Sequence, residues 1–189
     1  MAEAAAGPDA LLSLMRSRRA VRDYAAGAIP HEHMGRILQA GRLASSAGNN
    51  RIHRFLVVED SARIGLVRSL APGMLTVPAA LIVVCTDFGI ARERQVQVER
   101  DRTVWVDVGT AAMNMQLMAH SMGLGSCPVT SFSQRGVAVI LDLGGDVRPD
   151  LILILGHRRD RDLVPAARLG PEPVLGDFAY SEVYGRLWV

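Results

Sequence analysis

The segment from Val104 to Met122 constrains the fold more than any other part of the chain. Its apolar side chains are too numerous for one stripe of a helix: Trp105, Val106, Val108, Ala111, Ala112, Met113, Met115, Leu117, Met118, Ala119 and Met122. A helix that is apolar on nearly every side has to be buried on nearly every side. We therefore expect one face to pack inside the subunit and another to pack against a second subunit. The alternative is a central helix buried within a single chain.

Three further apolar runs predict strands. The runs from Ala80 to Thr86 and from Leu151 to Leu155 have no alternating polar residues, which is typical of strands buried on both faces. The run from Phe55 to Glu59 is predicted as a third strand. Together these runs indicate a small sheet at the centre of the protein.

Helices are expected around this sheet. Asp9 is expected to cap a helix that runs to about Arg18, and Ser61 to cap a short helix. Pro30 opens another helix. Its buried face should contain four apolar side chains, those of Met34, Ile37, Leu38 and Leu43. A short helix is expected from Val139 to Leu143. The pattern indicates an α+β fold in which helices surround a mixed or antiparallel sheet.

Composition bounds the class of protein. A chain of 189 residues, 49% of them hydrophobic, suits one domain over residues 1–189, with residues 1–7 as a flexible tail. The net charge of +2 does not by itself indicate a nucleic-acid partner. Cys85 and Cys127 suggest neither a disulfide framework nor a zinc site. The N-terminus lacks a signal-peptide pattern, and the longest apolar run, Val77 to Cys85, is too short for a membrane span, so we expect a cytoplasmic protein.

Two polar segments carry the chemistry. Arg18, Arg19 and Arg22 offer guanidinium groups, whose fixed fork of donors suits a phosphate. About twenty residues later, Ser46 and Asn49 offer a hydroxyl and an amide in a segment of small residues. A flavin mononucleotide site needs both kinds of group, because the cofactor has a charged phosphate at one end and a polar ring edge at the other.

An ordered set of motifs resembles the nitroreductase family of flavoproteins. The motifs are Arg18 to Arg22, Ala44 to His53, Asp107 to Asn114, Gly123 to Pro128, Leu151 to Gly156, and Glu182 to Gly185. Each motif alone is weak, but together they cover nearly the whole chain in the order of the family.

The chain departs from the family pattern in both polar motifs. Ala20 stands where the phosphate motif usually has a serine. Ser45, Arg51, Ile52 and His53 stand where the family often has Pro, Gln, Pro and Trp. The first departure removes one hydroxyl contact to the phosphate. The others concern the contacts to the flavin ring and therefore the choice of substrate.

The resemblance implies a three-layer fold, an interlocked homodimer with flavin sites between subunits, and an FMN-dependent oxidoreductase. Hydride would pass from NAD(P)H to the flavin and then to a nitroaromatic, a quinone or a similar acceptor. The implied phosphate clamp is Arg18, Arg19 and Arg22, with Arg168 as a fourth ligand. Ser46 and Asn49 would contact the ribityl chain and ring edge, and Arg51 would place positive charge near the ring. The segment facing the hydride-accepting nitrogen would be Pro128, Val129, Thr130 and Ser131.

Each of these assignments has a plainer alternative. The arginines also suit a solvated helix end, Ser46 and Asn49 a simple turn, and Arg51 a salt bridge between subunits. The segment from Pro128 to Ser131 also suits an ordinary loop. No catalytic protein side chain is expected, since the cofactor carries the chemistry. His31 and His33 would point to different faces of a helix, so no metal site is expected.

Two other functions remain open at this point. Some relatives in the family oxidise azoline or cyclodipeptide rings in natural-product pathways, sometimes with a partner subunit. A basic, non-enzymatic module that binds a polyanion is the third hypothesis, and the arginine cluster is its support.

Overall fold

The computed structural model describes residues 7–159 and 174–188. Its α-helices are α1 (Pro8–Ser17), α2 (His31–Arg42), α3 (Ser61–Ser69), α4 (Phe88–Glu93), α5 (Thr103–Ser121) and α6 (Gln134–Ile140). Its strands are β1 (Tyr24–Ala25), β2 (His53–Val58), β3 (Ala80–Asp87), β4 (Leu124–Val129) and β5 (Val147–Arg158). Short 3-10 helices are η1 (Ala47–Asn49) and η4 (Leu175–Asp177). Arg168 lies outside the described residues.

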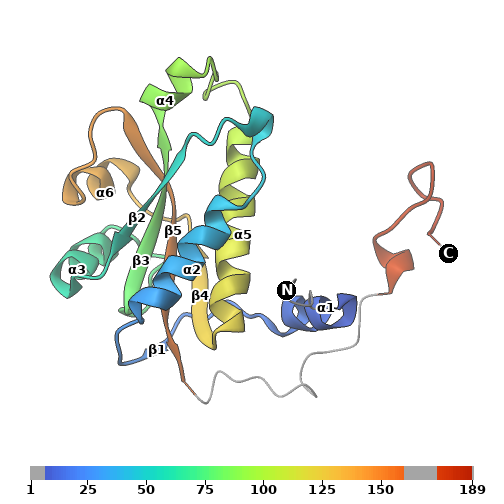
Figure 1. The fold of residues 1–189 in the computed structure, drawn as a ribbon, viewed down its shortest axis with the longest axis horizontal. Helices are drawn as coiled ribbons and strands as arrows, with labels where there is room; N and C mark the ends of the chain where they lie inside the picture. The colour runs from blue at the N-terminus through green and yellow to red at the C-terminus, as the bar shows by residue number, and fades with distance from the viewer. Residues whose placement is uncertain (1–6, 160–173, 189) are drawn as a thin grey trace, which may run out of the picture.

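All strand pairs in the sheet are antiparallel. The long strand β5 pairs with β3, with β4 and, near its C-terminal end, with β1, while β2 pairs with the other edge of β3. The predicted strands therefore exist and belong to one sheet, which runs through the centre of Figure 1.

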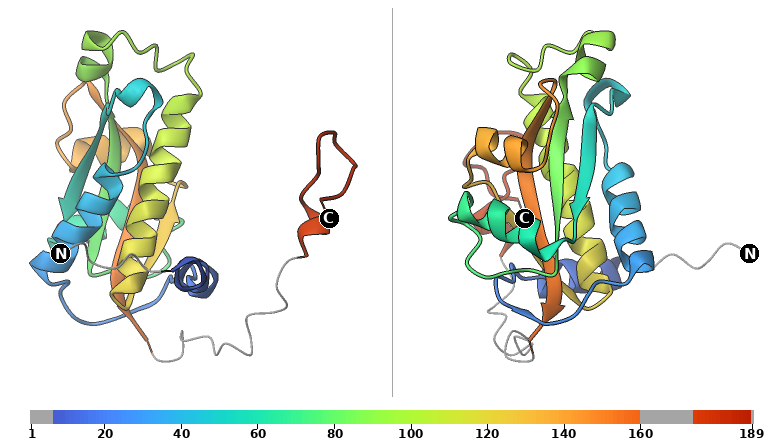
Figure 2. Two further views of the ribbon diagram at one scale, coloured as in Figure 1. Left: turned by 45° about the vertical axis from the view of Figure 1, so that its right-hand side comes forward. Right: turned by 90° about the vertical axis from the view of Figure 1, so that its left-hand side faces the viewer.

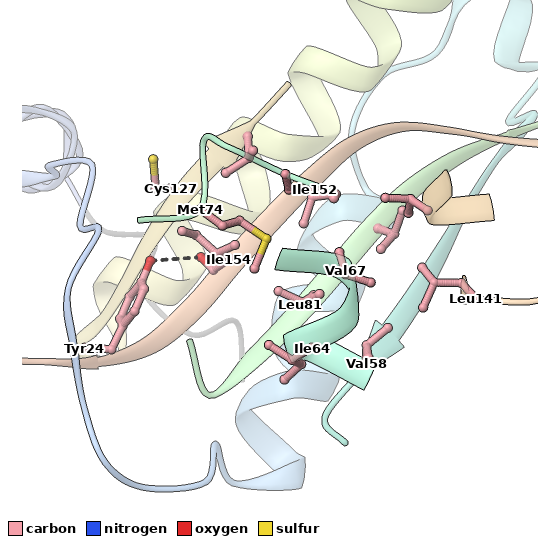
Figure 3. Close-up of a cluster of buried hydrophobic side chains, with 14 of the residues drawn as sticks. Tyr24, Val58, Ile64, Val67, Met74, Leu81, Cys127, Leu141, Ile152 and Ile154 are labelled. Atoms are coloured by element: carbon pink, nitrogen blue, oxygen red, sulfur yellow. Dashed lines mark hydrogen bonds between the residues drawn. The ribbon is translucent and has the colours of Figure 1, made fainter. Parts of the chain in front are cut away.

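Helices cover both faces of this sheet and produce three layers (Figure 2). On β3, Leu81 and Val83 point into a core shared with α3 and α6, and Ile82 and Val84 into a core shared with α2 and α5. This alternation is expected for a strand that is buried on both faces. Figure 3 shows the first core, where the hydroxyl of Tyr24 lies 3.4 Å from the carbonyl oxygen of Ile154. The expected α+β fold with a central antiparallel sheet is confirmed.

Helix α5 is only partly buried by its own chain. Val108, Ala112 and Met115 are buried against the sheet and α2. On another side, the exposed fractions of Trp105, Val106 and Met113 are 50%, 61% and 43%. The alternative of a helix buried wholly within one chain is therefore wrong for the single subunit. No helix in the described part of the chain is long and apolar enough to cross a membrane.

Some local predictions were wrong. Gly7 is the N-cap of α1, and Asp9 lies in the first turn, because Pro8 already occupies the first helical position. Asp60 caps α3 by accepting a hydrogen bond from the N–H of Arg63, at 2.8 Å, and Ser61 is the first helical residue.

Two further expectations about helices also need correction. Leu43 follows the end of α2 and is exposed, so it does not join Met34 and Ile37 in the core. Helix α6 covers Gln134–Ile140 and starts earlier than Val139, because the side chain of Ser133 caps it through the N–H of Gly136.

The C-terminal segment 174–188 lies apart from the three-layer body in Figure 1 and in the left-hand view of Figure 2. Its large apolar side chains are exposed, among them Phe178, Tyr184 and Trp188. The ring of Tyr180 packs on that of Tyr184, with centroids 4.6 Å apart.

Candidate functional site

The arginine segment lies against strand β4. It leaves the end of α1 and crosses below the sheet, where the N–H of Val21 donates to the carbonyl oxygen of Ser126 at 3.0 Å. Ala20 and Ser126 also form a parallel bridge. Gly125 permits this approach, because a β-carbon there would lie 2.8 Å from the Cβ of Val21. The segment is therefore fixed along the free edge of β4.

Arg18, Arg19 and Arg22 have little compensating negative charge. Within residues 7–159 and 174–188, no carboxylate forms an ion pair with any of the three. Arg19 instead donates to the carbonyl oxygens of Arg16 and Arg18, at 2.6 and 2.8 Å. Three neighbouring guanidinium groups without a counter-ion are expected to attract an anion.

The same strand leads from the arginines to the segment Pro128–Ser131. Pro128 and Val129 end β4, and Thr130 and Ser131 follow it. At about 3.3 Å per residue, Thr130 lies about 13 Å along the strand from Ser126. In the described part of the chain, the N–H groups of Thr130 and Ser131 donate to no protein acceptor. The structure thus brings together the arginines and two unused backbone donors on one edge.

The loop between α3 and β3 forms a second wall beside this edge. The hydroxyl of Thr76 donates to the carbonyl oxygen of Arg22 at 2.6 Å. Gly73 packs so close to Val129 that a β-carbon would lie 2.8 Å from its Cγ1. Leu75 and Val77 in the same loop are exposed. The strand edge and the loop therefore border one surface with a basic end and an apolar flank.

Thr130 also opens onto a surface pocket of about 530 Å³. The pocket is lined in addition by Trp105, Phe132, Ser133, Gln134, Arg135 and Asp150. The guanidinium of Arg148 lies 5.1 Å from the ring centroid of Trp105 and 5.1 Å from that of Phe88. The Nε of Arg148 in turn lies 2.6 Å from a carboxylate oxygen of Asp150. The indole is thus fixed at the pocket while half of its surface stays exposed.

Ser46, Asn49 and Arg51 form a tight turn at the other end of the molecule. The N–H of Arg51 donates to the hydroxyl of Ser46 at 3.1 Å, and its Nε donates to the amide oxygen of Asn49 at 2.6 Å. Gly48, Asn49 and Arg51 all have positive φ, at 57°, 54° and 50°. Residues other than glycine adopt this conformation only where surrounding contacts fix it. The turn is therefore a specified conformation of the chain.

Asp107 fixes the turn to helix α5. Both of its carboxylate oxygens accept a hydrogen bond from the N–H of Ala47, each at 3.1 Å. Asp107 is buried, and it lines a small pocket together with Ser46, Arg51 and His53. Its role was not predicted, although the sequence held a signal, since Asp107 is the single acidic residue of α5.

His53 belongs to a buried polar network. Its Nδ1 lies 3.2 Å from the hydroxyl of Thr86, which in turn forms a short hydrogen bond to Asp150. Burial lowers the pKa of His53 below its ordinary value, against the raising effect of Asp107 and Asp150. The imidazole is therefore neutral near pH 7 and anchored at the start of β2.

In one chain the two polar segments do not form a single site. Asp107, beside Ala47, and His120, whose Nε2 lies 2.8 Å from the hydroxyl of Ser17, lie near opposite ends of α5. Thirteen residues of helix separate them, or about 20 Å at 1.5 Å per residue. Figure 1 shows α1 at one end of α5 and the segment before β2 at the other.

Comparison with known proteins identifies relatives over most of the chain. The family model described as the nitroreductase family matches residues 15–82 and 66–157. A Methanothermobacter thermautotrophicus protein with the provisional name NADH dehydrogenase/NAD(P)H nitroreductase is 29% identical over 84% of this chain and 85% of its own. The 5,6-dimethylbenzimidazole synthase of Rhodospirillum rubrum is 27% identical over 88% of this chain and 93% of its own. The FMN reductase [NAD(P)H] of Bacillus subtilis is 25% identical over 80% of this chain and 67% of its own.

Solved structures show the same fold. A Bacteroides thetaiotaomicron protein, also provisionally named NADH dehydrogenase/NAD(P)H nitroreductase, superposes with a TM-score of 0.74 at 24% identity. The likeness covers 91% of this chain and 97% of that protein.

Proposed function

Because the chain belongs to the nitroreductase family, we propose that it is an FMN-dependent NAD(P)H oxidoreductase that acts as a homodimer. The family resemblance seen in the motifs is thereby confirmed, as is the expectation of an enzyme of this family. The observation that carries the finer proposal is the edge of β4. Among the described residues, it joins arginines that no carboxylate pairs to backbone N–H groups that have no protein acceptor.

The residues of this edge fit FMN. A phosphate dianion would compensate the charge of Arg18, Arg19 and Arg22, which no described carboxylate pairs. Ser126 and Thr130 lie about 13 Å apart along the direction of β4. This separation is comparable with the length of FMN in an extended conformation. Leu75 and Val77 offer apolar contact beside it. The residues therefore suit a ligand that is anionic at one end and aromatic at the other.

The backbone of Thr130 and Ser131 has an electrostatic role in this proposal. FMN supplies the hydride chemistry when bound, and the protein supplies binding and orientation. Fixed N–H donors stabilise negative charge that develops on an adjacent acceptor. The two N–H groups are held in place because the preceding residues of β4 pair with β5. No titrating side chain is needed for this contribution.

The homodimer is supported by two features of the single chain. Val106 and Met113 leave an apolar side of α5 exposed, and such surfaces often mark protein interfaces. The turn containing Ser46 and Arg51 and the arginine segment also lie near opposite ends of α5. Two copies related by a two-fold axis would allow the turn of one chain to complete the site of the other.

The acceptor site that we propose is the pocket beside Thr130. Its half-exposed Trp105 offers a flat apolar face, while the guanidinium of Arg135 offers hydrogen-bond donors. These groups suit an aromatic acceptor with oxygen substituents, such as a nitroaromatic or a quinone. NADH and NADPH are both proposed as donors, in line with the names of several relatives.

The proposal is tested with the purified full chain. We expect a yellow protein that releases FMN on denaturation, is bleached anaerobically by NADH or NADPH, and is reoxidised by a nitroaromatic or a quinone. A colourless protein that neither binds added FMN nor oxidises NAD(P)H would contradict the proposal. Turnover of peptide-derived rings with oxygen, without a nicotinamide, would favour the oxidase alternative.

A further inference from the structure

We propose that the pocket beside Thr130 prefers aromatic acceptors that carry a negatively charged substituent, and that Arg135 is the residue that recognises this charge. The inference rests on the proposed acceptor site and names the substrate class of that site. The class is a nitroaromatic or a quinone with a carboxylate or a sulfonate on its ring. The charged substituent takes no part in the hydride transfer and leaves the reaction unchanged.

The charge of the pocket comes from Arg135. Among the described residues that line the pocket, Arg135 and Asp150 have the charged side chains. The carboxylate of Asp150 is fully buried and has two partners, the Nε of Arg148 at 2.6 Å and the hydroxyl of Thr86, which donates a short hydrogen bond. Opposite charges this close offset each other for a ligand further away. The net charge that the pocket presents to a ligand is therefore positive.

The guanidinium of Arg135 is available to a ligand. Arg135 is exposed, and no carboxylate within residues 7–159 and 174–188 forms an ion pair with it. Arg92 is also exposed, but it is paired with Asp146 at 2.7 Å. The planar fork of an arginine matches the two oxygens of a carboxylate. An anion that enters the pocket thus meets a donor that has no protein carboxylate to give up.

The backbone that carries Arg135 is fixed at the start of α6. The hydroxyl of Ser133 accepts a hydrogen bond from the N–H of Gly136 at 3.2 Å. The side-chain amide of Gln134 donates to the carbonyl oxygen of Pro149 at 3.0 Å, which ties this turn to β5. The residues on either side of Arg135 are therefore held, and a ligand has to order only the arginine side chain.

Trp105 gives the pocket an aromatic face. The guanidinium of Arg148 lies 5.1 Å from the ring centroid of Trp105, within the range of a cation–π contact. The same guanidinium lies 5.1 Å from the ring centroid of Phe88 and is paired with Asp150, so the indole packs against a fixed group. Half of the surface of Trp105 stays exposed. The indole is thus held by the protein and still offers area to the ring of a ligand.

The pocket has room for both parts of a charged aromatic ligand. Its volume of about 530 Å³ lies within the range of small-molecule sites. Trp105 begins this surface from α5 and Arg135 from α6, and both line the same pocket. Stacking on the indole and pairing with the guanidinium are separate contacts. A neutral acceptor makes only the first, whereas an anionic acceptor makes both and is preferred.

The test compares two acceptors that differ in charge but little in shape, 4-nitrobenzoate and 4-nitrobenzamide. For the flavin-loaded full chain, kcat/KM is measured with NADH as donor, and calorimetric titration of the oxidised enzyme gives the two dissociation constants. Arg135→Gln should lower the preference for 4-nitrobenzoate about fivefold, the upper range for an exposed ion pair, and leave 4-nitrobenzamide unchanged. Arg63→Gln is the matched control, because it removes the same charge from an exposed residue of α3 that does not line the pocket.

Further variants separate charge from stacking. Arg135→Lys keeps the charge and should retain most of the preference, whereas Arg135→Glu should lower it below that of Arg135→Gln. Raising the ionic strength from about 0.01 M to about 1 M should reduce the preference of the parent but not that of Arg135→Gln. Trp105→Leu should weaken both acceptors alike. Melting temperature and flavin content identify variants that fail to fold, and in that case Trp105→Phe replaces Trp105→Leu.

The outcomes separate this inference from the proposed function. Equal preference in the parent and in Arg135→Gln would overturn the inference and leave the FMN oxidoreductase standing. An effect of Arg135→Gln on the KM for NADH alone would also overturn it, because the guanidinium would then bind the phosphates of the nicotinamide donor. A parent that is reduced by NADH but neither binds nor reduces either acceptor would overturn the acceptor site together with the inference. A chain that binds no FMN would overturn the proposed function itself.

Discussion

The N–H of Ala47 lies 3.1 Å from each carboxylate oxygen of Asp107, which joins the turn after α2 to the first half of α5. Asp107 is buried in a helix that is otherwise apolar or uncharged except for His120 near its end. A buried carboxylate is tolerated only where it is hydrogen-bonded. This contact therefore specifies where the turn containing Ser46 and Arg51 lies.

Asp107→Ala is expected to lower the free energy of unfolding by about 1 to 3 kcal/mol, because it leaves the N–H of Ala47 without its acceptor. Asp107→Asn keeps one acceptor oxygen and should have a smaller effect. Urea unfolding followed by circular dichroism measures both. Asp101→Ala is the control, since the carboxylate of Asp101 accepts a hydrogen bond from the N–H of Thr103 at the surface, at 2.9 Å. An unfolding curve for Asp107→Ala that matches the parent would contradict this role.

Much of the fold could be predicted because the pattern of apolar residues along the sequence matches the burial of the same residues in the structure. The runs Ala80–Thr86 and Leu151–Leu155 became the two central strands, since an uninterrupted apolar run has no stable place outside a sheet covered on both faces. Helix caps were less predictable. Ser61 and Asp60 are both good capping residues, and only the backbone conformation decides between them.

The site was predictable where neighbouring residues share one motif and unpredictable where the parts come from distant segments. The segment Arg18–Arg22 meets β4 through a bridge between Ala20 and Ser126, which no local pattern encodes. His120 and Arg158 contact each other only because α5 and β5 end at the same side of the sheet. Sequence spacing also could not indicate that the turn at Ser46 and the arginines lie near opposite ends of α5.

Gly125→Ala should displace the arginine segment. The added methyl group would lie 2.8 Å from both Cβ and Cγ1 of Val21, and a β-branched side chain on a bridged segment has little freedom to move. We expect a loss of about 1 to 3 kcal/mol in unfolding free energy and weaker FMN binding. Thermal unfolding and flavin titration measure the two effects.

The control for this substitution is Gly65→Ala. Gly65 lies in α3, and a β-carbon there would meet nothing within 4 Å. Alanine in a helix should stabilise the protein by about 0.5 to 1 kcal/mol. If Gly125→Ala were as stable as Gly65→Ala and bound flavin equally well, that result would contradict the close packing of Val21 on β4.

Val106→Glu is expected to prevent dimer formation and reduce flavin binding while the subunit stays folded. Val106 is 61% exposed on α5, so glutamate costs little in the single chain but would be buried in the proposed interface. Sedimentation velocity and flavin content measure the result. Leu66→Glu is the matched control, because Leu66 is 57% exposed on α3, on the other face of the sheet. A dimeric, flavin-loaded Val106→Glu variant would place the interface elsewhere.

Cys85 should make stability fall at alkaline pH. Burial, followed by the nearby charge of Asp150, raises the pKa of its thiol to about 12 from an ordinary value of 9.0. Between these two values the unfolded chain releases the thiol proton while the folded chain retains it. The unfolded state then binds fewer protons, so the free energy of unfolding decreases as pH rises above 9.0.

Below that range both states hold the proton, and the thiol contributes no pH dependence. Cys85→Ala should therefore cost a roughly constant amount at pH 7 to 8, from the lost packing on β3, and the difference from the parent should shrink as pH approaches 10.5. Urea unfolding of both proteins across this range, in the presence of a reductant, measures the difference. Cys127→Ala serves as the comparison, because burial also raises the pKa of Cys127 but nearby Arg22 and Arg18 oppose the rise. A difference between parent and Cys85→Ala that stays constant up to pH 10.5 would show that the Cys85 thiol ionises alike in the folded and unfolded chains.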